Sequence, residues 1–242
     1  MKQAFDNALS ALFKNEFAVW PLEGQRAAML LKDPYGASII HAAAHARLLR
    51  NIPSHFLTWA AVTQKDKQKA TPLHKAAANG CLSQLPLSCL TQKGMLLKDT
   101  YGKTPLHFAA FWGYLAQVPS ELLTAANLLT PDHIGETPLH YCAHNNDFDH
   151  VCRGARVTQA FLTPTLEGET PLHCYLKQGH DITKLAKIAN RETFRELLKW
   201  ILLPDNGNLL PLKVLEKCRR LHQKKENMKA SLAILAGNHR SL

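Results

Sequence analysis

The sequence predicts an all-α solenoid, in which short helix-turn-helix units stack in a row between helical caps. Three observations support this fold class. The chain has 242 residues, 46% of them are hydrophobic, and one short motif recurs at a constant spacing. A chain of this length and composition can bury a sizeable core. A constant spacing indicates that the core is built unit by unit, since each helical pair buries its apolar side against its neighbours.

The recurring motif is Thr-Pro-Leu-His, and its copies are 33 residues apart. They begin at Thr71, Thr104, Thr137 and Thr170, with a weaker copy at Ser38. Threonine or serine caps a helix N-terminus through its hydroxyl, and proline at the next position presets the helical φ. Glycine two residues before the motif, replaced once by Lys69, permits a tight turn. The motif therefore predicts a turn and the start of a helix in every unit.

The remainder of each unit also follows this spacing. Glycines are expected to end the first helices at Gly80, Gly113 and Gly179. A second pattern repeats a proline at Pro53, Pro86 and Pro119, and a leucine at Leu57, Leu90 and Leu123. We expect a second short helix that begins near each proline and turns its leucine inward.

These patterns divide the chain into three segments. Residues 1–32, in which Trp20-Pro21-Leu22 echoes the second half of a unit, are expected to form capping helices. Residues 33–180 are expected to hold five repeats. Residues 181–242 are expected to form a basic helical cap or tail, in which residues 207–212 resemble a degenerate further copy.

The repeated unit resembles the ankyrin repeat, with its Thr-Pro-Leu-His-x-Ala-Ala core, in about five copies from Asp33 to Gly179. The resemblance implies a module that binds another protein through its concave surface, with no catalytic residue and no cofactor. The second half, apolar-Pro-x-x-x-Leu-Thr, looks like that of ankyrin-repeat effectors exported by intracellular bacteria. This finer resemblance implies an effector that binds a host protein after secretion into the host cytosol. We expect the protein itself to be a monomer and cytoplasmic.

Ankyrin proteins typically turn the loop tips and the ends of the first helices outward. The repeat register gives as candidate partner-binding residues at the tips Tyr35, Tyr101, Lys103, His133, Ile134 and Glu136. The candidates at the helix ends are Phe111, Trp112, His144, Asn145, Lys177 and Gln178. Neighbours on a helix diverge by about 100°, so Phe111 and Trp112 cannot both point into the stack. We expect one of them to be exposed on the concave face; the alternative is that Trp112 packs against Tyr141 or His144.

The histidines and cysteines raise the question of metal binding or catalysis. The chain has thirteen histidines, but one recurs per repeat, and in ankyrin proteins that histidine hydrogen-bonds locally and ties adjacent repeats. No further ligands with metal spacing accompany them, so we expect no metal. The six cysteines form no C-x-x-C pair, which argues against a disulfide framework and favours a reducing cytosol. Cys142 and Cys174 are expected to be buried and inert.

The net charge of +10 lies mainly near the C-terminus, since residues 181–242 hold thirteen Lys or Arg against six Asp or Glu. The basic helix expected at residues 213–229 is interpreted as a solvated cap. Two alternatives remain: binding of nucleic acid or an anionic membrane surface through this helix, and an enzyme with its active site in residues 181–242. No apolar stretch approaches about eighteen residues, so we expect neither a signal peptide nor a transmembrane helix.

Overall fold

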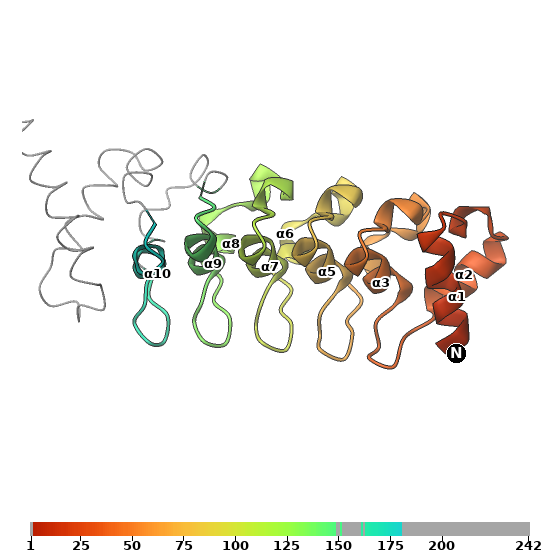
Figure 1. The fold of residues 1–242 in the computed structure, drawn as a ribbon, viewed down its shortest axis with the longest axis horizontal. Helices are drawn as coiled ribbons and strands as arrows, with labels where there is room; N and C mark the ends of the chain where they lie inside the picture. The colour runs from red at the N-terminus through yellow and green to blue at the C-terminus, as the bar shows by residue number, and fades with distance from the viewer. Residues whose placement is uncertain (1, 149–150, 152–160, 162, 181–242) are drawn as a thin grey trace, which may run out of the picture.

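The computed structural model describes residues 2–148, 151, 161 and 163–180. These residues form a row of helices without a strand, apart from an isolated bridge between Lys32 and Ser38. The row begins with α1 (Lys2–Phe13) and α2 (Leu22–Leu30), and inner helices follow side by side (Figure 1). The inner helices are α3 (Ile39–His45), α5 (Pro72–Ala78), α7 (Pro105–Phe111), α9 (Pro138–Asn145) and α10 (Pro171–Lys177). The predicted all-α solenoid is confirmed.

Each inner helix begins at the recurring motif through the same capping contacts. The Thr71 hydroxyl lies 2.8 Å from Nδ1 of His74, and the Thr71 backbone N–H donates to the same nitrogen at 3.1 Å. Pro72 is the first helical residue, where its missing N–H leaves no bond unmade. The same capping box occurs at Ser38, Thr104, Thr137 and Thr170. The predicted helix starts are therefore confirmed.

The residues that end the inner helices adopt a left-handed backbone. Their positive φ angles match the expected glycines, Gly80, Gly113 and Gly179. A Cβ on Gly80 would also lie 2.7 Å from the ring of Tyr114, so no other residue fits there without a shift. In the two remaining repeats the position is taken by Arg47, with φ of 61°, and Asn146, with φ of 56°.

The second half of each unit is not the single short helix that the sequence predicts. A 3-10 helix after each proline is followed by a separate short α-helix. The reason is visible at Leu57, where ψ is 64°, and at Thr58, whose backbone is extended. The Thr58 hydroxyl accepts the Ala61 N–H at 3.3 Å and starts a new helix. The expectation of one helix near each proline is wrong, whereas the expected burial of Leu57, Leu90 and Leu123 is confirmed.

In Figure 1 the 3-10 helices lie on the side of the stack away from the loop tips, and the short α-helices α6 and α8 lie beside the inner helices. The 3-10 helices after the prolines are η3 (Ser54–Phe56), η5 (Leu87–Cys89) and η7 (Ser120–Leu122), and the helices that follow them are α4 (Trp59–Val62), α6 (Gln92–Met95) and α8 (Ala125–Leu128). Three further 3-10 helices lie earlier in their units, η2 (Leu49–Asn51), η4 (Leu82–Gln84) and η6 (Leu115–Gln117), and η1 (Phe17–Val19) lies between α1 and α2.

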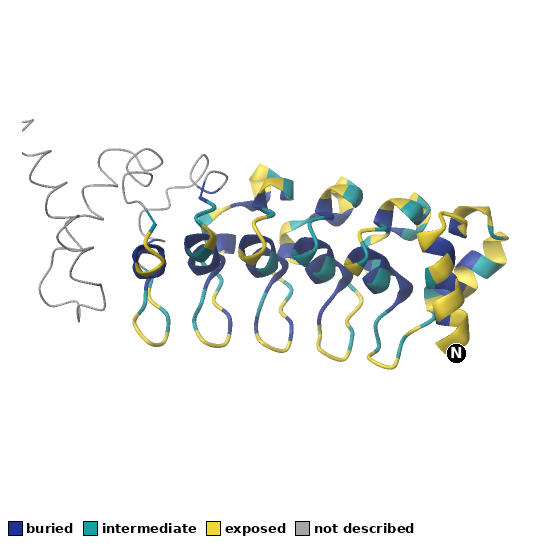
Figure 2. Ribbon diagram, viewed as in Figure 1, coloured by how far each residue is buried: buried dark blue, intermediate teal, exposed yellow. Residues whose placement is uncertain are grey.

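The core runs along the whole stack through the inner helices, which are buried, while the loop tips are exposed (Figure 2). The leucine of each motif is fully buried, at Leu73, Leu106, Leu139 and Leu172. Alanine pairs such as Ala109 and Ala110 are also fully buried, and their small side chains let neighbouring inner helices approach closely. Each helix is therefore held mainly by the units before and after it.

Within the described residues, no helix has the length and apolar character needed to span a membrane. The basic helix expected at residues 213–229 and the remainder of residues 181–242 lie outside the described residues.

Candidate partner-binding surface

The loop tips are shaped by an aspartate at the start of each turn. Oδ1 of Asp99 accepts hydrogen bonds from the backbone N–H groups of Tyr101 at 2.8 Å and Lys103 at 2.9 Å. The same pair of bonds forms at Asp33, Asp66 and Asp132, and Thr165 makes it through its hydroxyl. This role of the aspartates is not among the expectations drawn from the sequence, although their recurrence every 33 residues could have revealed it.

Adjacent tips are joined by backbone hydrogen bonds. The His133 N–H donates to the carbonyl oxygen of Tyr101 at 3.0 Å, and a Cβ on Gly102 would lie 2.9 Å from that nitrogen. Equivalent bonds run from Lys67 to Tyr35, from Thr100 to Gln68 and from Leu166 to Ile134. Because the backbone groups bond to each other, the side chains turn outward, and Tyr35, Tyr101 and Ile134 are exposed.

The recurring histidines tie the repeats together. The Thr71 backbone N–H donates to Nδ1 of His74, so Nδ1 accepts and the ring proton is assigned to Nε2, which donates to the Lys103 carbonyl oxygen at 3.1 Å. The same bond to the next repeat is made by His41, His107 and His140. Burial lowers the pKa of His74 and of His107 to about 4, against the attraction of nearby Asp99 and Asp132. The structural role expected of these histidines is confirmed.

We expect metal removal to leave the protein unchanged. In the described part of the chain, no group of three or more His, Cys, Asp and Glu side chains is arranged to hold a metal ion. Treatment with a chelator should not shift the melting temperature, and elemental analysis should find no stoichiometric zinc. A fall of several degrees on chelation would contradict this prediction, because bound metal would then contribute to folding.

The two cysteines singled out in the sequence, Cys142 and Cys174, are buried in α9 and α10. Burial raises the pKa of the Cys174 thiol to about 12. A thiol that stays protonated near neutral pH is a poor nucleophile, so Cys174 is a small buried side chain of the core.

The aromatic pair at the end of α7 is more exposed than expected, since Phe111 and Trp112 are 46% and 56% exposed. Their ring centroids are 5.0 Å apart in an edge-to-face arrangement. Phe111 also lies edge-to-face against Tyr141 of the next repeat, at 5.7 Å. The contact with Tyr141 that the alternative assigned to Trp112 is therefore made by Phe111, and both rings are exposed.

Trp112 lies at one wall of a groove of about 570 Å³, which runs between the loop tips and the ends of α3, α5 and α7. The lining includes three cations and three aromatic side chains that could contact a partner: Arg47, Lys75, Lys103, Tyr101, Trp112 and Tyr114. Three of these, Tyr101, Lys103 and Trp112, are candidates from the sequence. Arg47, Lys75 and Tyr114 were missed, although an arginine in place of a helix-ending glycine was a readable signal.

Of the other candidates at helix ends, His144, Asn145 and Gln178 contact a neighbouring repeat, whereas Lys177 pairs within its own repeat. Asn145 donates to the carbonyl oxygens of Ala110 and Phe111 at the end of α7. Gln178 and His144 form a side-chain hydrogen bond at 3.1 Å. Lys177 pairs with Glu169. These contacts hold the side chains of α9 and α10 in place, outside the groove lining.

The candidates at the fourth tip also lie outside the groove lining. The exposed His133 ring approaches Gly102 of the preceding tip, and Glu136 accepts the Nε2–H of His107 with its backbone oxygen. The Glu136 side chain is half-buried, whereas Ile134 is exposed at this tip.

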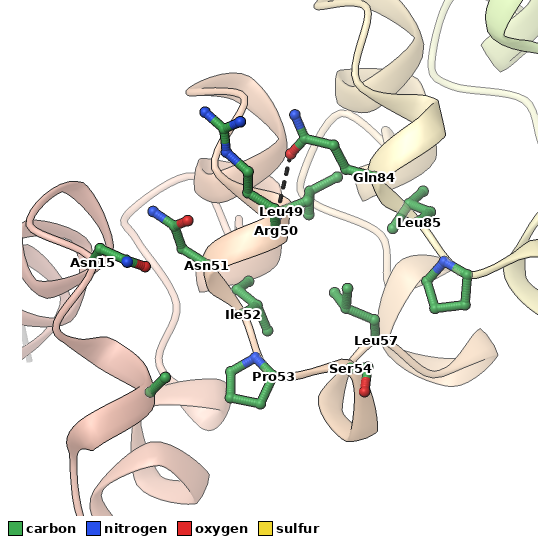
Figure 3. Close-up of a pocket in the computed structure, with 12 residues that line it drawn as sticks. Asn15, Leu49, Arg50, Asn51, Ile52, Pro53, Ser54, Leu57, Gln84 and Leu85 are labelled. Carbon is green, nitrogen blue, oxygen red and sulfur yellow. Dashed lines mark hydrogen bonds between the residues drawn. The ribbon is translucent and has the colours of Figure 1, made fainter.

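A second hollow, of about 520 Å³, lies among the 3-10 helices (Figure 3). Ile52, Pro53 and Leu85 give it an apolar wall, and the Arg50 backbone N–H donates to the Gln84 side chain at 3.2 Å. A similar hollow lined by Val118 and Pro119 recurs one unit later. The recurrence marks it as a product of the repeat geometry, whereas the groove beside Trp112 has side chains specific to three repeats.

The comparisons with known proteins agree with this geometry. Residues 40–123 match the family model described as ankyrin repeats, in three copies. No curated protein matches the chain. The matched residues include α5, α7 and most of α3, whose ends form the groove.

Proposed function

We propose, from the premise that this chain is built of ankyrin repeats, that it binds its partner protein through the concave face centred on Trp112. Ankyrin repeats are protein–protein interaction modules. The observation that carries the proposal is the exposure of Trp112 at the wall of a groove near the middle of the stack. Interfaces concentrate their affinity in a few large side chains of this kind, above all tryptophan, tyrosine and arginine.

The surroundings of Trp112 support the proposal. Its ring packs against Phe111, which in turn packs against the largely buried Tyr141. The exposed aromatic surface is therefore supported by the core of the next repeat. A ring that is held in place loses little conformational freedom on binding, which favours affinity. Tyr101, at the tip of the same repeat, adds a second exposed ring on the groove lining.

We expect the replacement Trp112→Ala to weaken partner binding by about 2 kcal/mol or more without unfolding the protein. The test is a quantitative affinity capture from cell lysate, followed by titration of the purified partner against both chains. The control Leu87→Ala removes a side chain that is 77% exposed, on η5 and outside the groove lining. Equal binding by the Trp112→Ala variant and the intact chain would contradict the proposed site.

The finer resemblance to bacterial effectors supports a further proposal, that the partner is a host protein met in the host cytosol. The second half of the repeats carries it, through the apolar-Pro-x-x-x-Leu-Thr pattern at Ile52, Leu85 and Val118. Expression of the chain with a translocation reporter in an intracellular bacterium tests it. Reporter signal confined to the bacterium would contradict the effector role and leave the partner-binding surface untouched.

The basic segment at residues 213–229 is the alternative binding site. We expect neutralisation of Lys217, Arg219, Arg220 and Lys224 to slow association at low salt and to leave specificity intact, because peripheral charges mainly speed encounter. If this variant loses all binding at physiological salt while Trp112→Ala binds normally, the enzyme and nucleic-acid alternatives become the better interpretations.

A further inference from the structure

We propose that the groove binds an extended acidic peptide segment of the partner, with a bulky apolar residue between its carboxylates; this rests on the proposed function. The cations of the groove come from three repeats. Arg47 follows α3, Lys75 belongs to α5, and Lys103 lies at the tip before α7. Each of them reaches one hollow that also presents the rings of Trp112 and Tyr101.

The groove lining carries more positive than negative charge, since it holds three cations and one carboxylate. Among the described residues, Arg47 and Lys103 form no ion pair, and Lys75 approaches Asp66 at 4.0 Å. The Arg47 guanidinium donates to the Tyr114 hydroxyl at 2.8 Å, and the Lys103 ammonium lies 5.0 Å from the centre of the Tyr141 ring. Asp99 also lines the groove and offsets one of the positive charges, although its Oδ1 accepts the two backbone N–H groups of the turn. Carboxylates of a partner would supply the missing counter-charge.

The backbone at Arg47 gives an independent argument. Four described non-glycine residues have positive φ, and two of them are the cations Arg47 and Lys69. Two others are asparagines, which tolerate this conformation, whereas long side chains rarely adopt it. The equivalent position is glycine in three of the other repeats, so Arg47 keeps a strained backbone where glycine would relieve it. Strain of this kind is typical of functional sites.

The charges along the stack favour a peptide over a nucleic acid. The tips before α9 and α10 carry Glu136 and Glu167, so the face that is basic at the groove turns acidic further on. A nucleic acid bears a negative charge on every residue and would meet these carboxylates as it continued along the stack. A peptide can place its carboxylates only opposite the cations and present an apolar side chain to Trp112.

The test is fluorescence anisotropy with the full chain and a short labelled peptide, in which glutamates flank one phenylalanine. The matched control peptide has glutamine at every glutamate position. We expect the glutamine peptide to bind at least about tenfold more weakly, and the acidic peptide to weaken as salt rises. Equal affinity for the two peptides, or tighter binding of a labelled single-stranded oligonucleotide, would overturn the proposal.

The variant Arg47→Gly removes a groove cation and relieves the strained backbone. We expect it to bind the acidic peptide about tenfold more weakly, with a melting temperature no lower than that of the intact chain. Lys103→Gln should weaken binding similarly. Arg50→Gln is the control, since Arg50 borders the second hollow among the 3-10 helices (Figure 3). An equal loss in Arg50→Gln would show attraction by net charge alone and overturn the proposal.

These outcomes are distinguishable from a failure of the proposed function. If both peptides fail to bind while Trp112→Ala still loses the captured partner, the acidic-segment proposal is wrong and the surface stands. If Trp112→Ala captures the partner normally, the proposed surface itself is wrong.

Discussion

Replacing Leu106 by alanine is expected to lower the free energy of unfolding by about 2 to 5 kcal/mol. Leu106 is fully buried in α7, which packs between α5 and α9 near the middle of the stack. The substitution would leave a cavity between three repeats, because small residues such as Ala109 and Ala110 cannot fill it. A defect at this position weakens two interfaces between repeats and should propagate along the stack.

Chemical denaturation followed by far-ultraviolet circular dichroism measures this loss. Leu87→Ala is the matched control, because the same side chain is removed from a position that is 77% exposed, and its effect should stay within about 0.5 kcal/mol. A melting temperature of Leu106→Ala equal to that of the intact chain, or a spectrum dominated by strand, would contradict the packing described above.

Acid is expected to unfold the stack through the recurring histidines. Burial lowers the pKa of His74 and of His107 from 6.5 to about 4, and it also lowers the pKa of His41, His140 and His173. Above pH 6.5 both folded and unfolded chains hold these rings neutral. Between pH 6.5 and 4 only the unfolded chain binds the protons, so stability falls as the pH falls and the loss is complete below the folded pKa. His74 and His107 each contribute a loss of roughly 3 kcal/mol.

The charged groups around these rings do not reverse the direction. Asp99 raises the pKa of His74 and Lys75 lowers it, while at His107 Asp132 acts against Lys103 and Lys98. Urea titrations at several pH values between 7 and 4 measure the effect. The variant His74→Gln should be less stable at pH 7 and should lose less on acidification. His133→Gln, at an exposed ring on a loop tip, should keep the full pH dependence. Unchanged stability of the intact chain at pH 4 would contradict the role of the histidines.

The parts of the fold that the sequence predicts correctly are local and periodic. The capping box at Thr71 needs only residues 71–74, and the helix end at Gly80 needs one positive φ. The sequence of a single repeat is therefore enough to predict both. The prediction of a single helix in the second half of each repeat was wrong because two local signals compete there. The proline starts a 3-10 turn, and Thr58 then caps a new helix before the first turn can lengthen.

The candidate surface could be predicted less well, because it depends on how repeats are placed in space. Arg47, Lys75 and Trp112 are far apart in the chain, and the repeat register alone does not show that they border one groove. The exposure of both Phe111 and Trp112 has a local cause. Side chains about 100° apart on a helix cannot both point into the stack, but both can lie on its outer side, and the Trp112 N–H still bonds to Phe108 as in a helix.

The bonds that join successive repeats have a consequence for how freely the tips can vary in sequence. His74 donates to the backbone oxygen of Lys103, and the tips bond to each other through backbone N–H and C=O groups. Every residue type offers a carbonyl oxygen, and every type except proline offers an N–H. The exposed tip side chains, apart from the aspartates and glycines that form the turns, can therefore be exchanged without loss of a bond that holds the stack. One scaffold of this kind can present many different surfaces, and natural selection can change what the protein recognises while its architecture stays the same.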